Sequence, residues 1–156
     1  MFENPLSNDE ILQKVVQFED MISEKSFTFF DVEDYENIID YYIELEMNEQ
    51  VNAALDFGLN QFPNDLTLSL IKVEVLNSKQ LVDDSYMLLK SLKQFYPNNI
   101  EVLYNLGKIY AITDRIQTAK NYFENAFDLI RVNDSYNDLL LSVSYTHLTL
   151  PTMMSV

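Results

Sequence analysis

The chain has 156 residues, a length that suits one domain, and its 25 acidic against 10 basic residues give a formal net charge of −15. This charge disfavours nucleic acid and anionic lipid as partners, because both would be repelled. The sequence contains no cysteine, which excludes disulfides, thiolate metal sites and thiol nucleophiles. Two glycines and four prolines are few, and this favours helices over turn-rich β folds.

The acidic residues concentrate at the start of the chain. Residues 1–50 contain 14 acidic residues and two lysines, which leaves a charge of −12 on this part. A basic or neutral protein segment fits such a surface best, although the charge would also serve simply to keep a helical protein soluble. The first ten residues, MFENPLSNDE, lack a signal-peptide pattern, and no later stretch approaches the roughly 20 apolar residues of a membrane span. We therefore expect a cytoplasmic protein that does not bind membranes.

Residues 1–30 are expected to form an N-terminal capping helix and an aromatic link. Ser7 and Glu10 have the spacing of a capping box. The apolar residues that follow at helical spacing are Ile11, Leu12, Val15, Val16, Phe18 and Ile22. The aromatic residues Phe27, Phe29 and Phe30 are expected to pack on the next hairpin, whose first helix Asp31 should start.

An internal repeat follows the link. The sequence FPND at residues 62–65 recurs as YPNN at residues 96–99, so that Pro63 and Pro97 are separated by one period of about 34 residues. Proline has no backbone donor and suits the turn after a helix. The period predicts three helical hairpins, at residues 31–64, 65–98 and 99–133. Their helices are expected over 34–46 and 49–61, 65–77 and 81–95, and 99–112 and 116–131.

The third hairpin has the most characteristic residues, in LYNLGKIY (residues 103–110) and AKNYFENAF (residues 119–127). These resemble the tetratricopeptide repeat family: Leu106 and Gly107 match its Leu-Gly pair, and Ala119 with Phe123 matches its A-x3-F pattern. Leu103 stands where the family usually has Trp, and Arg131 replaces its closing proline. The resemblance implies an all-α fold, an α-α superhelix in which antiparallel hairpins stack as a right-handed solenoid. The aromatic link also resembles an N-terminal segment of tetratricopeptide proteins of Bacteroidota.

The resemblance also implies which residues pack the repeats together, small ones where helices approach and large ones around them. They are Tyr42, Leu55, Gly58, Pro63, Leu89, Pro97, Leu106, Gly107, Tyr110, Ala119, Phe123 and Ala126. Ser69 and Lys72 depart from the apolar pattern of the middle hairpin. Its first helix is therefore expected either to shift by one residue or to pack through Leu68, Ile71 and Leu76.

After Leu141 the helical pattern stops. DSYNDLLL, residues 134–141, has the pattern of the first helix of a truncated fourth repeat. The Thr-rich residues 142–156 differ from the rest, and the stretch 142–152 resembles the in-frame translation of a sequencing adaptor. We expect this tail, which contains the sole histidine, His147, to be foreign to the natural protein.

The natural part therefore offers no Cys or His for catalysis, and paired acids such as Asp83 and Asp84 are expected on solvated faces. We expect no enzyme activity, no metal and no cofactor. The resemblance implies that the first helix of each repeat lines a groove for a peptide or a partner helix. The groove residues would be Glu36, Asp40, Glu44, Leu70, Glu74, Tyr104, Lys108 and Ala111. The predicted function is a protein-binding scaffold; the alternative is a regulatory or assembly module of a larger enzyme or secretion machine.

Overall fold

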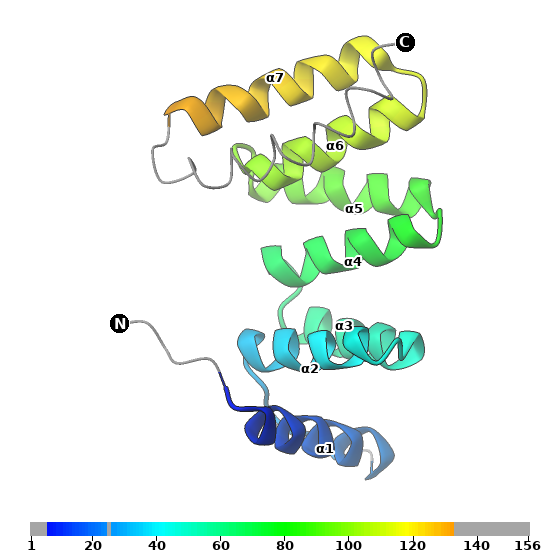
Figure 1. The fold of residues 1–156 in the computed structure, drawn as a ribbon, viewed down its shortest axis with the longest axis vertical. Helices are drawn as coiled ribbons and strands as arrows, with labels where there is room; N and C mark the ends of the chain where they lie inside the picture. The colour runs from blue at the N-terminus through cyan, green and yellow to red at the C-terminus, as the bar shows by residue number, and fades with distance from the viewer. Residues whose placement is uncertain (1–5, 25, 133–156) are drawn as a thin grey trace. The chain divides into compact units, whose positions relative to one another are not determined.

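The computed structural model describes residues 6–24 and 26–132, and the regular elements of this part of the chain are all helices (Figure 1). They are α1 (Asn8–Glu24), α2 (Val32–Glu44), α3 (Asn48–Gln61), α4 (Leu66–Ser78), α5 (Val82–Phe95), α6 (Ile100–Ile112) and α7 (Ile116–Val132). Successive helices pack against each other from α1 to α4 and from α5 to α7. The predicted all-α helical-repeat class is confirmed. The predicted fourth repeat at 134–141 and the tail at 142–156 lie outside the described residues.

The chain divides into two compact units, Met1–Ser78 and Lys79–Val156. The first contains α1 to α4 and the second contains α5 to α7. Length alone suggested one domain, and the division falls inside the segment predicted as the middle repeat, residues 65–98.

The helix boundaries recur with the period of the sequence repeat. Helices α2, α4 and α6 begin at Val32, Leu66 and Ile100 and each has 13 residues. Helices α3 and α5 begin at Asn48 and Val82 and each has 14 residues. Helix α2 starts and ends two residues earlier than the sequence pattern suggested, whereas the boundaries of the later helices fall within one residue of the expected ones. Ser69 and Lys72 therefore do not shift α4 out of the repeat register.

The helix starts repeat because Asp or Asn recurs at the capping position of each repeat. The side-chain oxygens of Asp31, Asp65 and Asn99 accept hydrogen bonds from backbone N–H groups three residues later, at 2.8, 2.9 and 3.0 Å. Each bond satisfies one of the unpaired N–H groups at a helix start. At Asp31 the cap is a full capping box, since the Asp34 carboxylate accepts from the Asp31 N–H at 3.2 Å. Ser7 and Glu10 form the capping box expected for α1.

The turns that contain the two prolines also have the same geometry. Phe62 and Tyr96, which precede Pro63 and Pro97, have φ and ψ of −127° and 71°, and of −127° and 64°. In both turns the backbone N–H donates to the carbonyl four residues earlier at 2.8 Å. The two prolines thus occupy equivalent turns, one between α3 and α4 and the other between α5 and α6.

Each hairpin turn contains a non-glycine residue in the left-handed region. These residues are Glu46, Gln80 and Asp114, with φ of 57°, 59° and 60°, and each is separated from the next by one repeat period. A side chain with a Cβ adopts this conformation at a cost of about 1–2 kcal/mol. The left-handed residue recurs at the same position of three hairpins, because this conformation reverses the backbone after α2, α4 and α6.

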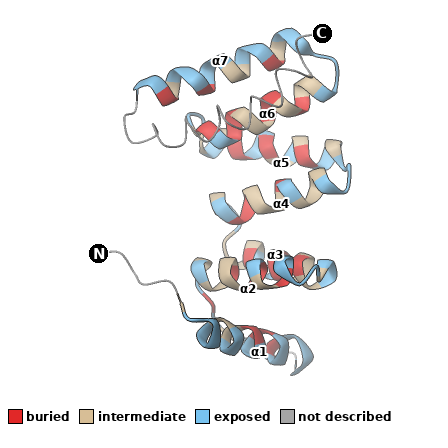
Figure 2. Cartoon of the chain, in the orientation of Figure 1, coloured by how far each residue is buried: buried red, intermediate tan, exposed pale blue. Residues whose placement is uncertain are grey.

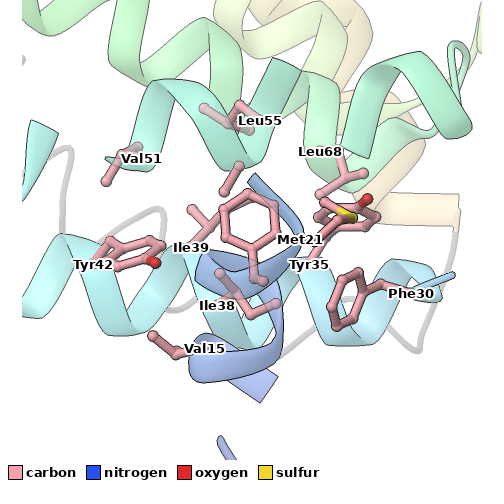
Figure 3. Packing of buried hydrophobic residues seen from close by; sticks show 12 residues of the cluster. Val15, Met21, Phe30, Tyr35, Ile38, Ile39, Tyr42, Val51, Leu55 and Leu68 are labelled. Carbon is pink, nitrogen blue, oxygen red and sulfur yellow. The ribbon is translucent and has the colours of Figure 1, made fainter. Parts of the chain in front are cut away.

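The core of the first unit gathers aromatic and aliphatic side chains from α1 to α4 (Figure 3). Phe18, Phe30 and Tyr35 are mutually in contact edge to face, with ring centroids 5.7–6.3 Å apart. Tyr42 is also buried, and its hydroxyl donates to the Glu19 carboxylate on α1 at 3.1 Å. Burial of such rings contributes roughly 1.5–3 kcal/mol each, which fixes α1 on α2.

The predicted packing of α1 and of the link is corrected in part. Val15, Phe18 and Met21 are the buried residues of α1, whereas Leu12, Val16 and Ile22 are exposed. In the link, Phe30 is buried, but Phe27 is 77% exposed and Phe29 is 68% exposed, with its ring 6.3 Å from that of Phe62. Apolar residues on several sides of a helix do not reveal which side meets its neighbour.

In the second unit α6 packs between α5 and α7. Figure 2 colours the buried parts of these helices. The buried residues include Leu89, Leu106, Gly107, Ala119 and Ala126. Two of the predicted packing residues, Tyr110 and Phe123, are only half-buried. The Tyr110 ring contacts the rings of Tyr86 and Tyr122.

Candidate functional site

The three acidic residues predicted for the groove lie along one side of α2. Glu36, Asp40 and Glu44 are four residues apart, a spacing that places side chains on the same side of a helix. Glu36 is half-buried, and the other two are exposed. This set, which we call the acidic face, is free of basic residues along its line on α2.

The electrostatic environment of the acidic face is unfavourable to the charges it carries. Burial raises the pKa of Glu36 above its usual value, and the neighbouring carboxylates of Asp65 and Asp40 raise that pKa further, while a hydrogen bond with Thr67 opposes the rise. Burial, together with the Glu44 carboxylate, likewise raises the pKa of Asp40. Like charges at this spacing repel each other, so a cation placed here would be attracted by all of them.

Helix α4 contributes the residues equivalent to Glu36 and Asp40, which are Leu70 and Glu74. Leu70 is half-buried and Glu74 is exposed. The capping residue Asp65 brings another carboxylate close to Glu36 from the start of α4. The predicted groove residues of α2 and α4 thus belong to one compact unit, and four of the five are acidic.

The remaining predicted residues, Tyr104, Lys108 and Ala111, lie along α6 in the second unit. The Lys108 ammonium is 5.2 Å from the Tyr104 ring centroid, which is a cation–π contact. The Tyr104 ring also contacts the Phe123 ring at 5.6 Å. Burial raises the pKa of the Tyr104 hydroxyl, which therefore stays protonated at neutral pH. These residues form a more apolar surface than the acidic face.

The structure also brings together a group of polar side chains that the sequence pattern did not single out. Tyr86, Tyr110 and Tyr122 come from α5, α6 and α7, and their rings are in contact. Lys90 and Lys93 lie beside them on α5. The spacing of Tyr86, Lys90 and Lys93 places them on one side of a helix, and this spacing is the sequence signal that could have indicated the cluster.

Two further features bear on the kind of function. No group of three or more His, Cys, Asp or Glu side chains suited to a metal ion occurs in residues 6–24 and 26–132. Within the same residues, no helix combines the length and the apolar character needed to cross a bilayer.

Comparison with known proteins leaves the family undetermined. No protein-family model matches the chain, and no curated protein matches it either.

Proposed function

We propose that this chain is a tetratricopeptide-like protein-binding module, without catalytic activity, whose acidic face binds a basic or neutral segment of a partner protein. The recurrence of caps, proline turns and left-handed residues with a single period supports the repeat class. In such repeats, stacked hairpins leave the side of each first helix available to a ligand, and the acidic face is on that helix in the first hairpin.

One observation carries the proposed ligand chemistry: Glu36 is half-buried among Asp40 and Asp65, with a raised pKa. A basic side chain bound there would relieve the repulsion among the three carboxylates. The interaction would also favour the charged form of Glu36, so binding should release protons at mildly acidic pH. A structural role alone would be better served by a neutral residue at this position.

The proposal has three further parts. Tyr104 on α6, which is half-buried and large, is a candidate aromatic anchor for the same or another partner segment. The net charge of −15 opposes binding to nucleic acid or anionic membranes. The absence of cysteine is compatible with action in the cytoplasm, which fractionation of cells would test.

Selection of peptides from a random displayed library on the purified chain tests the ligand class. We expect the selected peptides to be enriched in Lys and Arg, and we expect Glu36→Lys/Asp40→Lys to lose them. The matched control is Asp20→Lys/Glu24→Lys, which has the same charge change and the same four-residue spacing on the exposed side of α1. Selection of acidic peptides alone, or of peptides that Glu36→Lys/Asp40→Lys still binds, would contradict the proposal.

A further inference from the structure

Two adjoining cavities lie among α5, α6 and α7 in the second unit. Their volumes are about 280 and about 300 Å³, and Tyr86 and Tyr110 line both of them. The first cavity also has Asp83 and Arg115 in its wall, and the second has Lys90, Lys93 and Tyr122. Cavities of this size hold one or two side chains of a bound peptide each.

The tyrosine hydroxyls of this site hold each other in place. The Tyr86 and Tyr110 hydroxyl oxygens are 3.2 Å apart, and the two rings meet edge to face with centroids 5.8 Å apart. The Tyr110 ring stacks on the Tyr122 ring at 5.3 Å with an interplanar angle of 14°. The hydrogen bond with the Tyr86 hydroxyl, together with burial, raises the pKa of Tyr110 to about 12. The same hydrogen bond lowers the pKa of the Tyr86 hydroxyl. The Tyr110 hydroxyl therefore stays protonated at neutral pH, on an aromatic wall whose rings already contact one another.

The cations of the site are not neutralised by acidic side chains. In the described part of the chain, ion pairs are formed by Lys14, Lys72, Lys120 and Arg131. Lys90, Lys93 and Arg115 form none of these pairs. The Lys93 ammonium instead donates to the Tyr122 hydroxyl at 2.9 Å and lies 4.7 Å from the centre of its ring.

Among the described residues, three cations and one acid, Asp83, line this site, although the net charge of the chain is −15. Charge complementarity therefore calls for an anionic ligand here. A long polyanion such as RNA is disfavoured as the ligand by repulsion from the net charge of −15 of the chain. A short run of carboxylates avoids this repulsion, and apolar side chains between them would contact the tyrosine rings.

We propose that the two cavities around Tyr86 and Tyr110 bind an acidic segment of a partner polypeptide. Its carboxylates pair with Lys90, Lys93 and Arg115 and accept hydrogen bonds from the tyrosine hydroxyls. This site is separate from the acidic face and has the opposite charge preference. The inference therefore stands whether or not the acidic face binds a basic segment.

Fluorescence anisotropy with a labelled synthetic peptide that alternates Glu and Leu tests this site. The full chain should bind this probe more tightly than the Gln-Leu analogue. Lys90→Glu/Arg115→Glu should weaken binding of the Glu-Leu probe by about tenfold or more at low salt. Both side chains are exposed, one from each cavity, and this variant leaves the bond between Lys93 and Tyr122 intact. Its thermal unfolding should stay close to that of the wild type.

The matched control is Lys120→Glu/Arg131→Glu, which makes the same charge change on α7 outside the cavities and should keep binding within about threefold. Equal binding of the Glu and Gln peptides, or equal loss in both double variants, would overturn the proposal. Equally tight binding of a single-stranded RNA probe would identify a general polyanion site instead. The chain could instead self-associate without binding the probe, and only Lys90→Glu/Arg115→Glu could abolish this self-association. That result would assign the site to a second copy of the chain and would also overturn the proposal. Glu36→Lys/Asp40→Lys should bind the Glu-Leu probe at least as tightly as the wild type does. Failure of this proposal is therefore distinguishable from failure of the proposal for the acidic face.

Discussion

The ring of Phe123 occupies the space into which a side chain at Gly107 would extend. A Cβ at Gly107 would lie 2.6 Å from Cε1 and 2.8 Å from Cδ1 of Phe123, both closer than real contacts allow. The equivalent residues of the first hairpin are Ile39 and Leu55, which are both buried in one core cluster. Where the first helix has the large residue Ile39, the second helix has Leu55. Where the first helix has Gly107, the second helix has the larger Phe123.

The first prediction concerns this exchange of volume. Gly107→Val should lower the free energy of unfolding by about 1–3 kcal/mol, because the ring of Phe123 must move. Adding Phe123→Leu should recover part of that loss. Gly58→Ala is the contrasting variant, since its Cβ would lie 3.1 Å from Leu68 and Tyr35 atoms, and we expect a change of at most about 1 kcal/mol. Urea denaturation measures all three, and an undiminished loss in the double variant would refute the compensation.

The second prediction concerns a buried hydroxyl. Ser85 is fully buried, and its Oγ has no hydrogen-bond partner among the described residues. The equivalent residues one repeat period before and after it are Val51 and Ala119, which are also buried. Ser85→Ala should therefore raise the free energy of unfolding by about 1 kcal/mol, because it removes an unsatisfied polar group. A lower melting temperature for this variant would mean that the hydroxyl has a partner after all.

The third prediction concerns the left-handed turns. Gln80→Gly should stabilise the fold by about 0.5–1 kcal/mol, since glycine adopts a φ of 59° without the steric cost of a Cβ. Gln80 is chosen because its replacement leaves the net charge unchanged. Ser78→Gly at the end of α4 is the control. It should destabilise the fold, because glycine gives the unfolded chain more conformational freedom than serine does, and this freedom is lost when the helix forms. Similar effects of the two replacements would argue against strain at Gln80.

The fourth prediction separates stability from binding at the acidic face. The pKa of Glu36 is raised in the folded protein, so the folded state keeps the proton to higher pH than the unfolded chain does. The free energy of unfolding should accordingly fall as pH rises from the usual carboxyl range to the raised pKa, and Glu36→Gln should diminish this fall. At neutral pH Glu36→Gln should be more stable than the wild type and yet bind a basic peptide less tightly. Glu49→Gln, at an exposed site on α3, should produce neither effect, and denaturation across this pH range tests both variants.

The sequence predicted the repeat well because proline turns and capping residues act locally. Pro63 and Pro97 fixed the period, and the register survived at Ser69 and Lys72 although their side chains are polar. The Lys72 ammonium reaches the Asp56 carboxylate on α3 at 3.1 Å, so a half-buried lysine fits a position where an apolar residue was expected. Such a pairing depends on a neighbouring helix and cannot be read from α4 alone.

Other features escaped prediction because they depend on tertiary contacts. Glu46 and Gln80 do not favour the left-handed region, and only the demand of the hairpin turn places them there. The repeat pattern did not single out Tyr86 and Tyr122, but the structure gathers them with Tyr110 around half-open cavities. The acidic residues of α2 were predictable by spacing, whereas the approach of Asp65 to Glu36 was not, since it requires α4 to fold back toward α2.

The central claim is that the acidic face binds a basic segment, and anisotropy titration of a labelled Lys- and Arg-rich peptide from the library selection tests it most directly. At low salt, Glu36→Lys/Asp40→Lys should weaken the affinity by about tenfold or more, while Asp20→Lys/Glu24→Lys should change it by no more than about threefold. Unchanged affinity in the α2 double variant, with the fold intact by circular dichroism, would contradict the claim.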